Sequence, residues 1–254
     1  YSRNDVIRHY SIDKKILEPG KWFYLRMPRV FFEKILPRLK HKLGDFAEIT
    51  RGFTTGANEF FYMKEIDHLY ETDYLADSKK FKDLGITAKT GKALEEKGLI
   101  YIENEAGKRF VIDKKDVIPV TRSFREIRSF KNPPPSTFCL YTETPGKFTS
   151  FYIDYGETIG IDNRPTLKNR KEWYALSELK PCRILLPVAL LDRLFIPISD
   201  RPLICDKRLY TLDTRKPDKV WLYLNSTIFL ITIQLFSRKG SSSARGAVMD
   251  ATVE

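Results

Sequence analysis

Short runs of alternating apolar and polar residues predict β-strands in the first half of the chain. The segment 42–52 spaces Leu43, Phe46 and Ile49 roughly like a strand, and 58–66 reads as the next one. The stretch between them, RGFTTGANEFF at 51–61, is therefore predicted to be a loop that joins two strands.

Two further β-signals follow. Segment 100–112 holds two β-rich runs around an Asn-Glu-Ala-Gly turn, which is typical of a hairpin. Segment 137–142, TFCLYT, predicts another strand, and 123–130, SFREIRSF, a short helical turn. The segment 149–160, TSFYIDYGETIG, fits either a helix or a strand.

Proline residues interrupt the apolar runs in the second half of the chain. Between 182 and 213 the pattern predicts three core strands broken by Pro187, Pro197 and Pro202. Beyond them, Asp218 is predicted to cap a helix from about Lys219 to Phe236. Its spacing indicates four buried positions, namely Val220, Leu224, Ile228 and Ile231.

These elements predict an α+β fold, with a twisted, largely antiparallel sheet and peripheral helices. Residues 1–42 are expected to be a lead-in segment that ends in a short helix, and residues 43–254 one recognition domain. The polar, basic stretch 237–247 is expected to be a flexible or ligand-ordered loop.

Composition narrows the functional class. Of 254 residues 42% are hydrophobic, enough for a folded core, and no uninterrupted apolar run reaches membrane-spanning length, so no membrane partner is expected. The 44 Lys and Arg against 33 Asp and Glu give a formal charge of +11. Such an excess favours a polyanionic partner, nucleic acid first, although a merely basic surface remains an alternative.

The three cysteines and three histidines are scattered and form no C-x-x-C pair, so no metal site is predicted. With no secretory signal, the thiols are expected to be reduced in a cytoplasmic protein. The chain also lacks an initiator Met, so we expect it to be part of a longer protein.

The sequence gives little support for a catalytic motif in this chain. The glycine spacing in 51–61 fits neither a dinucleotide-binding nor a P-loop pattern, so no cofactor site is predicted in this chain. At 131–136, KNPPPS is similar to the Asn-Pro-Pro-aromatic turn of adenine amino-methyltransferases, but Pro135 replaces the ring that would stack on a flipped base. A proline-rich surface turn is the prediction.

Basic residues mixed with aromatic or small polar residues form three clusters, at 122–131, 164–174 and 237–246. Lys and Arg neutralise phosphates, and Arg and Asn bond bidentately to base edges. Solvated charged faces are the alternative for each cluster taken alone.

Read in order, KLGDFAEITRGFTTGANEFFYM, VIPVTRSFREIRSF, NRKEWYAL, RILLPVALLDRLFIPI and LYLNSTIF resemble one family. The motifs are similar to the C-terminal target-recognition region of adenine-N6 DNA methyltransferases from restriction-modification systems. Within these enzymes the resemblance is to the single-chain ones, in which a Taq-type specificity domain follows the catalytic domain. The resemblance spans roughly Trp22 to the C-terminus. It matches the family's Thr-Gly-x-Asn loop at Thr55, Gly56 and Asn58.

The resemblance implies a DNA-binding specificity domain whose catalytic methyltransferase domain, with its S-adenosylmethionine pocket, lies upstream of Tyr1. Double-stranded DNA and that upstream domain are the expected partners, and this chain is expected to be non-catalytic. The parent enzyme would be an adenine-specific methyltransferase, possibly with endonuclease activity.

The charge clusters and the family's loop together nominate a set of DNA-facing residues: Arg51, Thr54, Thr55, Gly56, Asn58, Arg122, Arg125, Lys168, Arg170, Lys171, Arg238, Lys239 and Arg245. Two alternatives stay open: a methyltransferase or nuclease domain in its own right, and a protein-interaction module with a basic surface.

Overall fold

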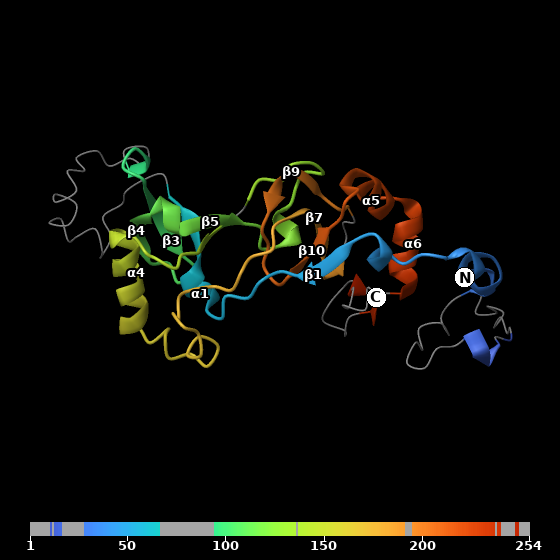
Figure 1. The fold of residues 1–254 in the computed structure, drawn as a ribbon, viewed down its shortest axis with the longest axis horizontal. Helices are drawn as coiled ribbons and strands as arrows, with labels where there is room; N and C mark the ends of the chain where they lie inside the picture. Colours follow the sequence, from blue (N-terminus) through green and yellow to red (C-terminus); the bar gives the residue numbers. More distant parts are fainter. Residues whose placement is uncertain are drawn as a thin grey trace, which may run out of the picture. The chain divides into compact units, whose positions relative to one another are not determined.

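The computed structural model describes residues 11, 13–16, 28–66, 94–135, 137–190, 195–236, 238–239 and 247–248. They fall into two compact units (Figure 1). We call Thr50–Pro187 with Pro197–Asp213 the sheet unit, and Tyr1–Ile49 with Val188–Ile196 and Thr214–Glu254 the terminal unit. The predicted domain boundary at residues 42 and 43 stays a prediction.

The sheet unit contains a five-stranded sheet with the order β4-β3-β2-β6-β5, in which all neighbours are antiparallel. The hairpin predicted at 100–112 is confirmed as β3 and β4, whose turn has a positive φ of 74° at Gly107. The bounds are β2 (Tyr62–Glu65), β3 (Leu99–Asn104), β4 (Arg109–Asp113), β5 (Val117–Val120) and β6 (Thr137–Leu140).

A second sheet has the order β1-β10-β7-β9, and β7 is antiparallel to both of its neighbours. The three predicted core strands are confirmed as β7 (Cys182–Pro187), β9 (Ile198–Leu203) and β10 (Leu209–Asp213), and β1 spans Glu48–Arg51. Pro202 does not break a strand as predicted, because it lies in β9, an edge strand that tolerates a missing amide donor.

The ambiguous segment is a helix, α4 (Lys147–Thr158), which packs along β4 (Figure 1). Its first turn is held by Asp113, which accepts hydrogen bonds from the amides of Phe148 at 2.8 Å and Thr149 at 3.0 Å. A carboxylate at a helix N-terminus satisfies amides that have no partner within the helix. The capping residue thus comes from the neighbouring strand.

The segment 58–66 is only partly the predicted strand, since it begins with a helical turn, α1 (Asn58–Phe61), before β2. In a strand Phe60 and Phe61 would face opposite sides, but both are buried. Phe60 stacks on Tyr152 of α4 with ring centroids 4.4 Å apart, which places the helical turn in the main core.

Short 3-10 turns flank these elements, and one of them replaces the start of the predicted strand at 42–52. The turn predicted in 123–130 is confirmed at η7. The bounds are η1 (Lys14–Ile16), η4 (Leu36–Arg38), η5 (Leu43–Asp45), η6 (Lys114–Asp116) and η7 (Phe124–Glu126), with a π-helical turn at η3 (Phe31–Ile35).

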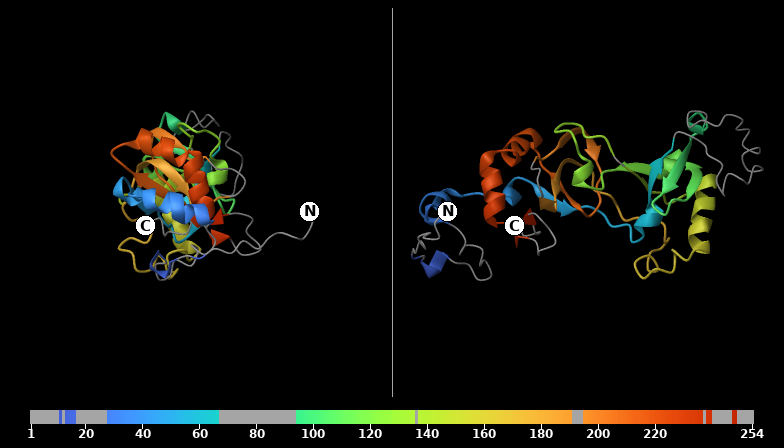
Figure 2. Two further views of the ribbon diagram at one scale, coloured as in Figure 1. Left: turned by 90° about the vertical axis from the view of Figure 1, so that its right-hand side faces the viewer. Right: turned by 180° about the vertical axis from the view of Figure 1, so that it is seen from behind.

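In the described part of the terminal unit, the single helix predicted at about 219–236 is divided into α5 (Pro217–Leu224) and α6 (Thr227–Phe236), which pack against each other (Figure 2). The chain breaks because Asn225 donates a side-chain hydrogen bond to the carbonyl of Trp221 at 2.9 Å, while the hydroxyl of Ser226 accepts from a backbone amide of α6. A small sheet completes the unit, with the order β11-β12-β8 (Arg238–Lys239, Ala247–Val248 and Ala189–Leu190).

The break changes which positions face inward. Val220 and Leu224 are buried as predicted, but Ile228 and Ile231 are 65% and 51% exposed. The predicted cap is also wrong: Asp218 lies inside the first turn, and the residue at the N-cap position is Lys216. Among the described residues, no helix is long and apolar enough to cross a membrane. The predicted α+β class, with largely antiparallel sheets and few helices, is confirmed.

Candidate nucleic-acid interface

The connection from β1 to α1 runs against the turn between β9 and β10. A Cβ atom at Gly52 would lie 2.3 Å from the carbonyl oxygen of Asp206 and 2.4 Å from that of Cys205, so only glycine allows this approach. Backbone hydrogen bonds join Phe53 to Cys205 and Lys207 at 3.1 and 2.9 Å. Two stretches about 150 residues apart in sequence are thereby fixed side by side.

This contact gathers exposed cations that belong to both stretches. Arg51 donates from Nε to the carbonyl oxygen of Lys207 at 2.8 Å, and the side chains of Arg51, Lys207 and Arg208 are all exposed. We call these three residues the turn cluster. Lys207 and Arg208 were missed from the sequence, where Asp-Lys-Arg between two apolar strands signals a tight charged turn.

Beneath the turn cluster lies a buried polar network. The hydroxyl of Tyr62 donates to the carboxylate of Asp206 at 2.6 Å, and the guanidinium of Arg122 stacks on the Tyr62 ring, 3.9 Å from its centroid. Burial raises the pKa of Tyr62, and the bond to Asp206 raises it further. Arg122 is itself buried and pairs with Glu105, and burial lowers its pKa.

The predicted loop residues Thr55, Gly56 and Asn58 are tied into the fold. Thr55 is fully buried, and its hydroxyl donates to Oδ1 of Asn58 at 2.7 Å. Gly56 has a φ of 85°, and its carbonyl oxygen accepts from the hydroxyl of Thr166 at 3.2 Å. Thr54, in contrast, is exposed.

The basic segment 164–174 divides into exposed and internal cations. Lys168 and Lys171 are exposed, whereas Arg170 reaches inward and donates to the carbonyl oxygen of Thr55 at 2.8 Å. Burial lowers the pKa of Arg170, and its guanidinium also lies within 3.4 Å of the carbonyl oxygen of Trp173. Arg170 therefore joins this segment to the β1–α1 loop.

The other predicted residues are spread more widely. Arg125 is exposed in η7. Arg238 and Lys239 form β11 in the terminal unit, and Arg245 lies outside the described residues. The structure brings together Arg51, the β1–α1 loop and Arg122 with the β9–β10 turn, and it connects Arg170 to the same loop.

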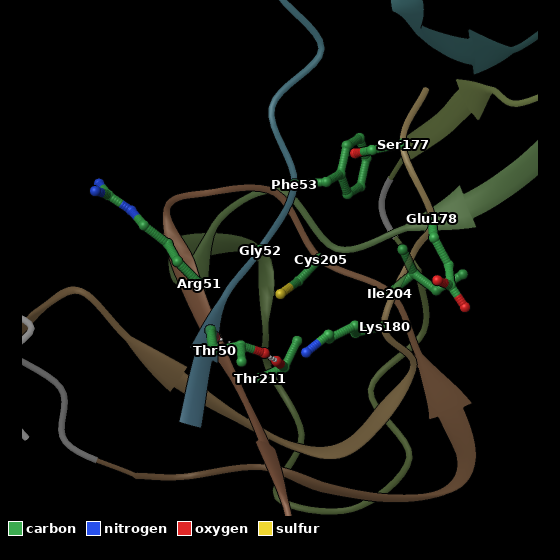
Figure 3. Close-up of a pocket in the computed structure, with 10 residues that line it drawn as sticks. All are labelled: Thr50, Arg51, Gly52, Phe53, Ser177, Glu178, Lys180, Ile204, Cys205 and Thr211. Carbon is green, nitrogen blue, oxygen red and sulfur yellow. Dashed lines mark hydrogen bonds between the residues drawn. The ribbon is translucent and has the colours of Figure 1, made fainter. Parts of the chain in front are cut away.

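A cavity of about 210 Å³ opens beside Gly52 (Figure 3). Thr50 and Thr211 share a 2.6 Å hydrogen bond there, and Arg51 points away from the other labelled side chains. Pockets for small organic ligands usually start near ~300 Å³. The lining residues are Thr50, Arg51, Gly52, Phe53, Ser177, Glu178, Lys180, Ile204, Cys205 and Thr211.

The described part of the KNPPPS segment, residues 131–135, bends at Asn132. Asn132 has a positive φ of 49°, and its side-chain oxygen accepts from the amide of Asp200 at 2.8 Å. Its amide nitrogen donates to the Asp200 carboxylate at 3.1 Å, and Pro134 and Pro135 are exposed. The Asn132 side chain thus holds the start of β9.

Cys139, Cys182 and Cys205 are free and buried. Burial raises the pKa of each thiol, for Cys182 to about 12, which disfavours the reactive thiolate. Among the described residues, no group of three or more His, Cys, Asp or Glu side chains is placed to hold a metal ion.

Comparison with known proteins gives likenesses to solved structures. No protein-family model and no curated protein matches the chain. The structure of the type IIG restriction endonuclease BpuSI matches over 73% of this chain at 14% identity, with a TM-score of 0.30. The chain spans 21%, about a fifth, of that protein's length. At this TM-score the likeness carries no argument about function.

Proposed function

We propose that this chain is the sequence-specific, DNA-binding target-recognition part of a restriction-modification adenine-N6 DNA methyltransferase. Double-stranded DNA is the proposed partner, and a methyltransferase domain elsewhere in the parent protein, loaded with S-adenosylmethionine, would carry out the chemistry. The family resemblance of the ordered motifs and the formal charge of +11 support this proposal.

The observation that carries the proposal is the turn cluster. Arg51, Lys207 and Arg208 come from two distant stretches, yet a backbone contact that only Gly52 permits holds them together. The turn that carries Lys207 and Arg208 is held firmly in place, because the preceding residue, Asp206, is buried and accepts a hydrogen bond from Tyr62. Rigid, exposed cations suit the positioning contacts that proteins make with DNA phosphates.

We divide the nominated residues, apart from the buried Arg122, into two proposed roles according to their exposure. Exposed Arg51, Thr54, Arg125, Lys168 and Lys171 are proposed to touch DNA, together with the turn residues Lys207 and Arg208. Thr55, Gly56, Asn58 and Arg170 are proposed to hold the loop in place. Arg238, Lys239 and Arg245 stay predictions.

Duplex binding measured against salt tests the proposal. Phosphate contacts release counterions, so the logarithm of the binding constant should fall linearly with the logarithm of salt concentration, by about 0.9 per phosphate neutralised. Selection from random duplexes should then enrich one short sequence. A duplex affinity that does not change with salt concentration, or selected duplexes that share no common sequence, would count against DNA recognition.

Saturable binding of S-adenosylmethionine to this chain would instead favour the open alternative of a catalytic methyltransferase domain. The absence of duplex binding at low salt would favour a protein-interaction module. Calorimetric titrations with the methyl donor and with a short duplex therefore separate target recognition from a methyltransferase domain and from a protein-interaction module, and cleavage of the duplex would identify a nuclease.

A further inference from the structure

Arg122 is an almost buried cation with a half-exposed anion in front of it. Its side chain is 9% exposed, whereas that of Glu105, its ion-pair partner in the β3–β4 turn, is 40% exposed. The other face of the guanidinium is covered by the Tyr62 ring. Glu105 is thus the more exposed of the two partners of this ion pair.

The Arg122 site is under-compensated for a buried charge. Its Nε is buried and, among the described residues, has no hydrogen-bond partner. Burial lowers the pKa of Arg122 most, and the positive charge of Arg208, which is 53% exposed, lowers it too. Tyr62, Asp206 and Glu126 act in the opposite direction but do not cancel the shift. Buried guanidinium groups without a full set of acceptors are costly, so an anion that accepts from more N–H groups of Arg122 than Glu105 does would be favoured here.

A DNA phosphate has the required chemistry. Its non-bridging oxygens carry a negative charge and match the planar fork of a guanidinium, so it can accept two parallel hydrogen bonds. Glu105 is on a turn at the surface and its side chain is 40% exposed, so solvent and ions in solution reach this partner of the pair and a competing anion can displace it. Arg208 and the rest of the turn cluster would draw the phosphate toward the same place.

We propose that Arg122 forms an anion site that the Glu105 carboxylate occupies in the free protein and that a backbone phosphate of duplex DNA takes over on binding. Glu105 then acts as a built-in competitor that lowers affinity for DNA. This inference rests on the proposed function, because it names the ligand of the same surface.

The test compares two neutralised glutamates on one hairpin. Glu105→Gln removes the competitor, while Glu103→Gln makes the same charge change at a residue of similar exposure, 37%, that pairs with Arg109. We expect E105Q to bind a short duplex about fivefold more tightly than wild type, and E103Q to stay within about twofold. Melting curves of both variants show whether each is folded.

Arg122→Gln, alone and combined with Glu105→Gln, completes a double-mutant cycle for the two residues. In the R122Q background, E105Q should no longer raise affinity, because the site that it uncovers is gone. If R122Q does not fold, the comparison of E105Q with E103Q decides alone. Equal affinities of E105Q and E103Q, in a protein whose binding is salt-dependent, would overturn the inference alone; a wild type that binds no duplex would overturn the proposed function as well.

Discussion

The hydroxyl of Tyr62 in β2 donates a 2.6 Å hydrogen bond to the carboxylate of Asp206 in the β9–β10 turn, and both residues are buried. This bond joins the two sheets of the sheet unit at a point where the backbone also pairs, through bridges of Asp206 with Phe53 and of Cys205 with Thr121. The geometry of the turn cluster therefore depends on residues that never reach the surface.

Tyr62→Phe should lower the free energy of unfolding by about 2 to 3 kcal/mol, because a buried carboxylate loses a donor. Tyr152→Phe is the control: this tyrosine is also fully buried, but both partners of its hydroxyl are neutral, since it donates to the carbonyl oxygen of Phe60 at 2.6 Å and accepts from the side-chain amide of Asn104 at 3.1 Å. We expect about 1 kcal/mol there. Urea denaturation measures both, and equal losses would contradict a special role for the charged acceptor.

Gly52→Ala tests the close approach between the β1–α1 connection and the turn. The added methyl group would meet two backbone carbonyl oxygens that cannot rotate away, so we expect a loss of about 2 to 3 kcal/mol and weaker duplex binding. At Gly44 a Cβ meets nothing within 4 Å, and G44A should be close to neutral. A stable G52A variant with wild-type binding would show that this contact does not fix the turn cluster.

Lys207→Gln and Arg208→Gln should each reduce the salt dependence of duplex binding by up to about 0.9 in the log-log slope, one phosphate contact apiece. Lys147→Gln makes the same charge change at an exposed position of the sheet unit, at the start of α4. Its slope should match wild type. If all three variants behave alike, net charge rather than the turn cluster governs binding.

Arg170 and Lys168 are close in sequence but are expected to differ in role. Arg170→Gln removes donors to the carbonyls of Thr55 and Trp173 and should cost about 2 kcal/mol of stability. Exposed Lys168→Gln should change stability by less than about 0.5 kcal/mol and act mainly on duplex binding. Thermal melts with and without duplex distinguish the two effects.

Sequence patterns predicted the elements that are determined by residues within the same segment. The β3–β4 hairpin followed from two β-rich runs and a turn that contains Gly107, and β7, β9 and β10 followed from apolar runs. The helical turn α1 was missed because Phe60 and Phe61 are drawn inward by distant rings, Tyr152 and Trp173. No pattern inside 58–66 carries that information.

The same limit applies to the site. Lys207 and Arg208 become neighbours of Arg51 only through the contact at Gly52, which depends on pairing across about 150 residues. The break between α5 and α6 has a tertiary part beside its local hydrogen bonds, since Asn225 also accepts from the amide of Ile196 at 2.8 Å. Charge clustering located basic segments, but the sequence did not show that Arg170 turns inward.

The buried thiols make stability fall in alkaline solution. Burial raises the pKa of Cys182 to about 12, from 9.0, so the unfolded chain releases this proton at a lower pH than the folded one. The stabilisation is complete below about pH 9 and is lost as pH rises toward 12, at up to about 1.4 kcal/mol per pH unit for each thiol.

The pKa values of Cys139 and Cys205 are raised in the same way, so these thiols add to the slope of stability against pH. Cys182→Ala should make the decline of unfolding free energy between about pH 9 and pH 10 shallower, while tyrosines of the unfolded chain, which begin to titrate in this range, add to the decline in both proteins alike. Urea titrations across this range measure it, and an unchanged slope in C182A would mean that this thiol is not protected in the folded protein.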